Sequence, residues 1–134
     1  MNFNIHTDGG SRGNPGNAAI GIVVEVEKKI VWEKSKAIGV TTNNVAEYTA
    51  VVEALDYLSS LSPAPESVHF YLDSLLVVQQ LSKRYKINSE PLLLLAQKSW
   101  QLIDTLGCPV EFTHVLRDKN KQADALVNKA LDAL

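Results

Sequence analysis

The chain has 134 residues, of which 46% are hydrophobic and 21% charged, and its formal net charge is −2. This length predicts one domain, 1–134, and the longest apolar run, Leu92 to Ala96, is far too short to cross a membrane. A single cysteine, Cys108, excludes an internal disulfide and a cysteine metal cluster, so we expect a cytoplasmic protein without a signal peptide. The acidic balance argues mildly against nucleic-acid binding, although clustered basic residues can override it.

The predicted elements begin with three strands and continue as alternating strands and helices. Strands are predicted at 3–7, 18–26, 29–40, 68–72 and 110–115, and helices at 45–61, 74–82, 92–106 and 119–134. The order βββαβααβα implies an α/β fold, with a mixed five-stranded sheet flanked by helices. A helix joins the strand at 3–7 to the strand at 68–72, which indicates that these two strands run parallel.

The first predicted strand leads into a glycine-rich motif, TDGGSRGNPG at 7–16. A turn of this composition can hold residues at positive φ and bring backbone N–H groups close to a ligand. Asp8 is expected to be the last residue of the strand, with its carboxylate beside open backbone. A hairpin loop is the ordinary interpretation. A phosphate-binding P-loop is disfavoured, because 18–26 reads as a strand where that motif requires a helix.

Three further carboxylates stand at unusual positions. Asp73 follows the strand 68–72, so it and Asp8 lie at the carboxyl ends of parallel strands, where open α/β sheets bind ligands. Glu47 and Asp124 each head the apolar stripe of a helix. These stripes continue through Val51, Ala54, Leu55 and Leu58, and through Val127, Leu131 and Leu134. The ordinary alternatives are a helix N-cap for Asp73, a solvated side chain for Glu47 and a carboxylate paired with Lys or Arg for Asp124.

Four carboxylates at one place would repel one another unless a positive group lay among them. A pair of Mg²⁺ ions meets this need, because hard divalent cations prefer oxygen ligands. Two such ions roughly 3.5–4 Å apart can stabilise both the attacking and the leaving oxygen of a phosphoryl displacement.

The chain resembles ribonuclease H, type 1 branch, over essentially its whole length. The resemblance rests on four motifs in the family's order: TDGGSRGNPG at 7–16, TNNVAEY at 42–48, LDS at 72–74, and His114 followed by RDKNKQAD at 117–124. Each motif alone is weakly specific, but all four in order make a specific signal. The resemblance therefore implies a ribonuclease H-like fold.

The resemblance also implies an endonuclease that hydrolyses the RNA strand of RNA/DNA hybrids and leaves 5′-phosphate and 3′-hydroxyl ends. Asp8, Glu47, Asp73 and Asp124 would hold two Mg²⁺ ions, for which Mn²⁺ can substitute. His114 would assist proton movement or product departure, with a purely structural role as its alternative. The partner would be the hybrid duplex, bound by a monomer through Gly9, Gly10, Ser11, Arg12, Asn14, Asn43, Asn44, Ser74, Lys83, Arg84 and Lys86. The asparagines would read 2′-hydroxyls in the minor groove.

The sequence departs from part of the family at two places. Leu75 stands where some members carry a glutamine that contacts substrate, so that contact is expected to be absent. The connection from Ser82 to Pro91 is short and retains only three cations, where some members insert a basic protrusion. Two alternatives remain at this point: a module that binds hybrid duplex or protein without cleaving, and a metal-dependent nuclease of the same fold that acts on structured DNA or double-stranded RNA.

Overall fold

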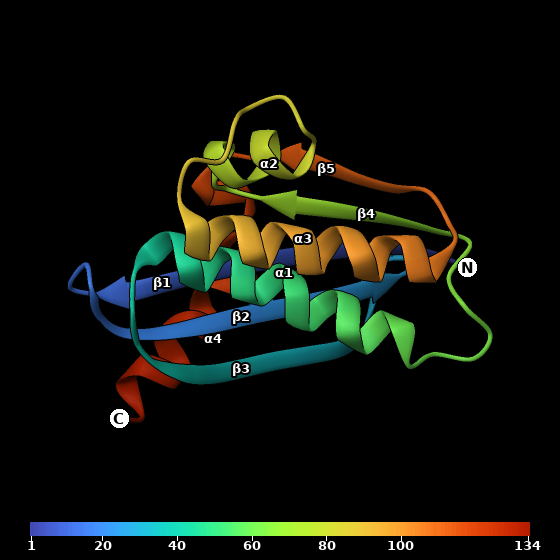
Figure 1. The fold of residues 1–134 in the computed structure, drawn as a ribbon. Helices are drawn as coiled ribbons and strands as arrows, with labels where there is room; N and C mark the ends of the chain where they lie inside the picture. Colours follow the sequence, from blue (N-terminus) through green and yellow to red (C-terminus); the bar gives the residue numbers. More distant parts are fainter.

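A mixed sheet of five strands in the order β3-β2-β1-β4-β5 organises the structure, a computed structural model that describes residues 1–134 (Figure 1). Its strands are β1 (Asn2–Arg12), β2 (Gly16–Val26), β3 (Lys29–Thr41), β4 (Ser67–Leu72) and β5 (Val110–His114). Its helices are α1 (Asn43–Ser59), α2 (Leu75–Leu81), α3 (Glu90–Leu106) and α4 (Lys121–Asp132), and a short 3₁₀ helix, η1 (Arg117–Lys119), precedes α4. The predicted fold class is confirmed.

The sheet combines antiparallel and parallel pairing around β1. β1 pairs antiparallel with β2 from Phe3 to Arg12, and parallel with β4 from Asn2 to Thr7. β5 adds parallel to β4 and forms one edge, while β3 forms the other. The parallel course of β1 and β4 that the intervening helix predicted is confirmed, because a helical connection returns the chain to the same end of the sheet.

The helices cover the sheet on two faces. α1 and α3 lie side by side on one face, and α4 lies on the other (Figure 1). The α1 face holds the main core of twenty buried residues, which includes the predicted stripe Val51, Ala54, Leu55 and Leu58. The α4 face holds a cluster of only three buried residues, Ala19, Val127 and Leu131. β2 serves both faces, since Ala19 packs against α4 and Ile20 packs in the main core.

Local chemistry sets where the helices begin and end. Thr42 and Ser89 cap α1 and α3 with hydroxyls that accept from the N–H groups of Val45 and Leu92. Pro91 was predicted to lie in the connection before α3, but it lies in the first turn, where a missing N–H is tolerated. The last helix begins at Lys121 instead of 119, and Leu134 lies beyond its end with 70% of its surface exposed.

No helix of the chain is both long enough and apolar enough to span a membrane.

Candidate active site

Asp8 and Asp73 lie where the parallel pairing of β1 and β4 ends. Thr7 and Leu72 form the last pair, and each aspartate is the next residue along its segment. The prediction that Asp8 ends its strand is wrong, because antiparallel pairing with β2 carries β1 on to Arg12. Asp8 therefore lies within β1 and is paired with β2, but β4 has ended on its other side.

Glu47 reaches this place because α1 packs directly on the backbone of β1. Gly9 permits the approach: a Cβ atom at this position would overlap the backbone of Ala46 and Glu47. Glu47 is only 8% exposed although its side chain is ionisable, which agrees with its predicted place at the head of a buried stripe. The contact between β1 and α1 thus brings a helix carboxylate beside the two strand-end aspartates.

Three of the four predicted carboxylates form a compact group. Asp8, Glu47 and Asp73 each offer a carboxylate oxygen, and these atoms all lie within 4.8 Å of one another. Asp124 lines the same cleft from the first turn of α4 but stands outside this group. Its carboxylate accepts a hydrogen bond of 3.4 Å from the amide of Asn128. Sheet, α1 and α4 thus each contribute acidic groups to one cleft.

The cluster is strained electrostatically. Burial, together with the charges of Asp73 and Asp124, raises the pKa of Asp8 to about 7. Burial and the charge of Asp8 raise the pKa of Glu47 well above its usual range. The pKa of Asp73 is also raised, chiefly by burial, although Asn120 and the nearby charge of Arg117 oppose the shift. The charged cluster consequently destabilises the protein unless a cation neutralises it.

The donor set fits a hard divalent cation. Glu47 Oε2 is buried and accepts no hydrogen bond from the protein. Asp8 Oδ1 accepts one bond of 3.0 Å from the N–H of Gly9, which leaves further lone pairs free. All ligands offered are carboxylate oxygens, which suit Mg²⁺ or Mn²⁺ and not a soft metal. These residues can therefore hold the ions that the family resemblance implies.

Asn120 is buried beneath the cleft and links β1 to the start of α4, a role that was not predicted from the sequence. It is 1% exposed, and its amide donates a bond of 2.9 Å to the carbonyl of Thr7, one residue before Asp8. Its own carbonyl accepts from the N–H of Asp124 at 3.1 Å. The sequence does place an asparagine one helical turn before Asp124, but this spacing alone did not indicate that its side chain is buried.

The predicted asparagine residues connect the β1–β2 hairpin to α1. Asn43 Oδ1 accepts from the N–H and the hydroxyl of Ser11 at 2.8 and 3.2 Å. Asn14 Oδ1 in turn accepts from the N–H of Asn43 at 3.0 Å. The side-chain NH₂ groups of Asn14 and Asn43 donate to no protein group, so both remain available to a ligand. Arg12 is less free, because it pairs with Asp132 at 2.6 Å.

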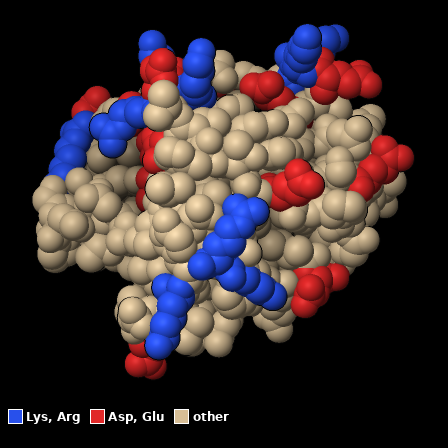
Figure 2. Space-filling view, turned by 90° about the horizontal axis from the view of Figure 1, so that it is seen from above, with Lys and Arg blue, Asp and Glu red and all other residues tan.

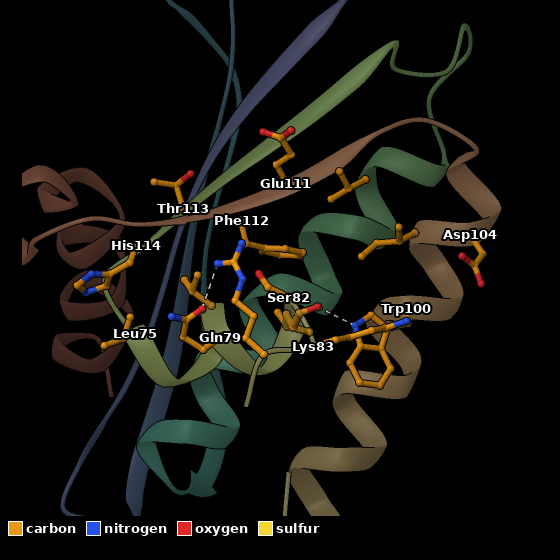
Figure 3. Close-up of a pocket in the computed structure, with 15 residues that line it drawn as sticks. Leu75, Gln79, Ser82, Lys83, Trp100, Asp104, Glu111, Phe112, Thr113 and His114 are labelled. Carbon is orange, nitrogen blue, oxygen red and sulfur yellow. Dashed lines mark hydrogen bonds between the residues drawn. The ribbon is translucent and has the colours of Figure 1, made fainter. Parts of the chain in front are cut away.

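An open cleft of about 400 Å³ collects most of the predicted site residues. Its walls include Asp8, Gly9, Gly10, Ser11, Arg12, Asn43, Asn44, Glu47, Asp73, Ser74 and Asp124, with Arg117 and Asn128 in addition. His114, Lys83 and Arg84 line a different hollow between α2, α3 and β5, and Lys86 lines neither (Figure 3). The two hollows adjoin, because His114 pairs with Leu72, the residue before Asp73.

Comparison with known proteins agrees with this geometry. The family described as reverse transcriptase-like matches residues 6–130. The crystal structure of RNase H1 from Halobacterium salinarum is 36% identical, with a TM-score of 0.93, and the match covers the whole of both chains. The chain belongs to the ribonuclease H family.

Other members of the ribonuclease H family extend the comparison. A bifunctional protein of Mycobacterium tuberculosis is 39% identical over 135 residues, which are 99% of this chain and 36% of that protein. The chain therefore spans about a third of the length of that mycobacterial relative. LC11-RNase H1, solved in complex with an RNA/DNA hybrid, is 38% identical with a TM-score of 0.92, over 98% of this chain and 97% of that one.

Proposed function

We propose that the protein is a metal-dependent endonuclease that hydrolyses the RNA strand of RNA/DNA hybrids. The observation that carries this proposal is the group of three carboxylates, crowded within 4.8 Å and opening into a cleft. Such a group is costly to a fold, so its presence favours a catalytic role over a purely binding one. The hybrid-bound structure of the related LC11-RNase H1 supports the choice of substrate.

Asp8, Glu47, Asp73 and Asp124 would hold two Mg²⁺ ions, which supply positive charge for the phosphate and activate the attacking water. The residues around them keep this set of ligands in place. Gly9 lets α1 approach β1, and Asn120 connects the segment before Asp8 to the start of α4. The acidic groups thus keep their mutual positions before any ligand arrives, which is the preorganisation that catalysis requires.

Substrate contact is assigned to polar groups of the carboxylate cleft and to Asn14 of the adjoining β1–β2 hairpin. The free NH₂ groups of Asn14 and Asn43 are suited to 2′-hydroxyl and base-edge acceptors in a minor groove. Arg117 places a cation in the cleft beside Asp73, where it can meet a phosphate. We assign proton transfer or product departure to His114, which is exposed at the end of β5.

The activity is tested with end-labelled RNA/DNA, RNA/RNA and DNA/DNA duplexes, each incubated with Mg²⁺, Mn²⁺ or EDTA. We expect cleavage of the RNA strand of the hybrid with either metal, 5′-phosphate and 3′-hydroxyl products, and no cleavage in EDTA. Cleavage of double-stranded RNA alone would redirect the proposal to a different nuclease. Tight hybrid binding without cleavage would make the protein a binding module.

We also propose that residues 1–134 act as one domain and as a monomer in the cytoplasm. The family match over 6–130 supports a single domain, and the lone cysteine, Cys108, suits a reducing compartment.

A further inference from the structure

The outer edge of β5 carries backbone groups without partners. β5 ends the sheet, so only its β4 side is paired. Pro109 accepts from Val68 N–H at 3.0 Å and Val115 N–H donates to Leu72 at 2.8 Å, so the odd-numbered residues point toward β4. Because backbone direction alternates along a strand, the N–H and C=O groups of Val110, Phe112 and His114 point outward.

A hollow of about 800 Å³ runs along this same edge (Figure 3). All five residues of β5 line it. Consecutive side chains of a strand point to opposite faces, so a hollow that contacts all five follows the edge and is not confined to one face. α2, α3 and the segment between them form the opposite wall. We call this hollow the β5 groove.

The β5 groove has a mixed lining, in which apolar side chains lie beside two cations. Phe112, Trp100 and Ile103 are among its lining residues, and Trp100 is held by a bond of 3.0 Å from its ring N–H to the carbonyl of Leu81. Lys83 Nζ lies 4.9 Å from the centre of the Trp100 ring. Arg84 contacts only the neutral side chain of Gln79, at 3.3 Å. Neither cation forms an ion pair with a carboxylate of the protein.

The opposite edge of the sheet is protected in a way that β5 is not. β3 carries lysines at 29, 34 and 36, and its pairing with β2 is irregular at two places. Edge lysines and bulges discourage the addition of a further strand. β5 has the sequence VEFTH, which contains no lysine and no proline, and its register with β4 is regular. The two edges therefore differ in their readiness to accept a strand.

We propose that the β5 groove binds an extended, internal segment of a partner protein, which adds to β5 as a sixth strand. Main-chain bonds to Val110, Phe112 and His114 would align the segment, as in other cases of strand addition. Every second side chain would enter the groove, apolar where it meets Phe112 and Trp100, and acidic where it meets Lys83 and Arg84.

A nucleic acid fits the β5 groove less well. A duplex has no extended main chain that can pair with Val110, Phe112 and His114, so its phosphates can meet Lys83 and Arg84 without engaging this edge. Figure 2 shows this side of the molecule as mostly uncharged, with basic side chains gathered near its middle and others beside acidic ones along one edge. An acidic and apolar peptide needs only the two local cations, Lys83 and Arg84.

The test begins with a library of random nine-residue segments displayed inside a carrier protein and selected on the full chain. We expect enrichment of segments in which apolar residues alternate, with at least one Asp or Glu. An enriched segment is then synthesised with blocked termini. At about ten times its Kd it should slow amide hydrogen exchange at Phe112 and His114 roughly tenfold. N-methylation should abolish binding at alternate peptide positions only.

Charge reversal tests the role of the cations. Lys83→Glu with Arg84→Glu should weaken the synthetic peptide by roughly tenfold, whereas Lys98→Glu on the exposed side of α3 should not change its affinity. Failure to enrich any segment, or equal tolerance of N-methylation at all positions, would overturn the proposal. So would protection of the Phe112 amide by an RNA/DNA hybrid, or by a dimer of this chain that forms with rising concentration.

Discussion

Replacing Asp8 by Asn should stabilise the metal-free protein and abolish cleavage. The ionised Asp8 is buried beside Asp73 and Asp124, which raises its pKa from 3.8 to about 7. An amide keeps the shape and can still accept from Gly9 N–H, but it carries no charge. Asn also cannot replace the anionic ligand that a divalent cation requires. Stability and activity should therefore change in opposite directions.

The magnitude follows from linkage between protonation and folding. Between pH 3.8 and about 7 the unfolded chain releases the Asp8 proton while the folded protein retains it, so stability falls as the pH rises through this window. The cost of Asp8 is about 1 kcal/mol at pH 4.5 and about 4 kcal/mol at pH 8. The Asn variant escapes this cost, so its stability relative to wild type should rise by about 3 kcal/mol between the two pH values.

Urea denaturation in EDTA at pH 4.5 and pH 8 measures this difference directly. Asp56→Asn, at an exposed position on α1, is the matched control and should show no such pH-dependent gain. Mg²⁺ should then stabilise wild type and have a smaller effect on Asp8→Asn. A gain of equal size at both pH values would refute the electrostatic reasoning, and substantial Mg²⁺-dependent cleavage by the folded variant would refute the site assignment.

Three further predictions concern the geometry and the substrate. Gly9→Ala should lower the free energy of unfolding by about 3 kcal/mol or more, because its Cβ would overlap the α1 backbone. Gly10→Ala is the control: its Cβ would lie 3.7 Å from Val127, so it should cost far less in the same denaturation assay. His114→Ala should lower kcat at saturating hybrid by roughly 10²-fold without lowering Tm, and wild-type turnover would return His114 to a structural role. Replacing Lys83, Arg84 and Lys86 together by Ala should weaken hybrid binding and flatten the dependence of affinity on salt concentration. Binding is measured in Ca²⁺ to suppress cleavage. An unchanged affinity and an unchanged salt dependence would show that the duplex is held elsewhere.

The sheet and its helices were predictable because periodicity and connection lengths report them directly. The helical connection between β1 and β4 predicts parallel strands, and that pairing alone places Asp8 beside Asp73. Glu47 could be recognised because a carboxylate in line with Val51 and Leu55 has to lie at the edge of the core. These inferences concern backbone geometry, which local sequence determines strongly.

Side-chain partnerships were less accessible to sequence reasoning. The extension of β1 to Arg12 depends on a long antiparallel register with β2, and the glycines of the motif suggested a turn instead. The bond from Asn120 to Thr7 and the pair of Arg12 with Asp132 each join residues more than a hundred positions apart. The separation of His114 and Lys83 from the carboxylate cleft depends on how α2 and α3 pack beside β5.

The attachment of α4 has a consequence for how the protein would lose activity. α4 carries Asp124, yet its apolar anchor is a cluster of three buried residues, against twenty on the α1 face. Segments with few buried apolar contacts open at a lower free energy than the rest of a fold. Gentle heating or dilute denaturant should therefore detach α4, and Asp124 with it, while the main core still gives a native circular dichroism signal. Inactivation would precede unfolding, and a compound that binds across α4 and β2 could protect activity without raising the stability of the core.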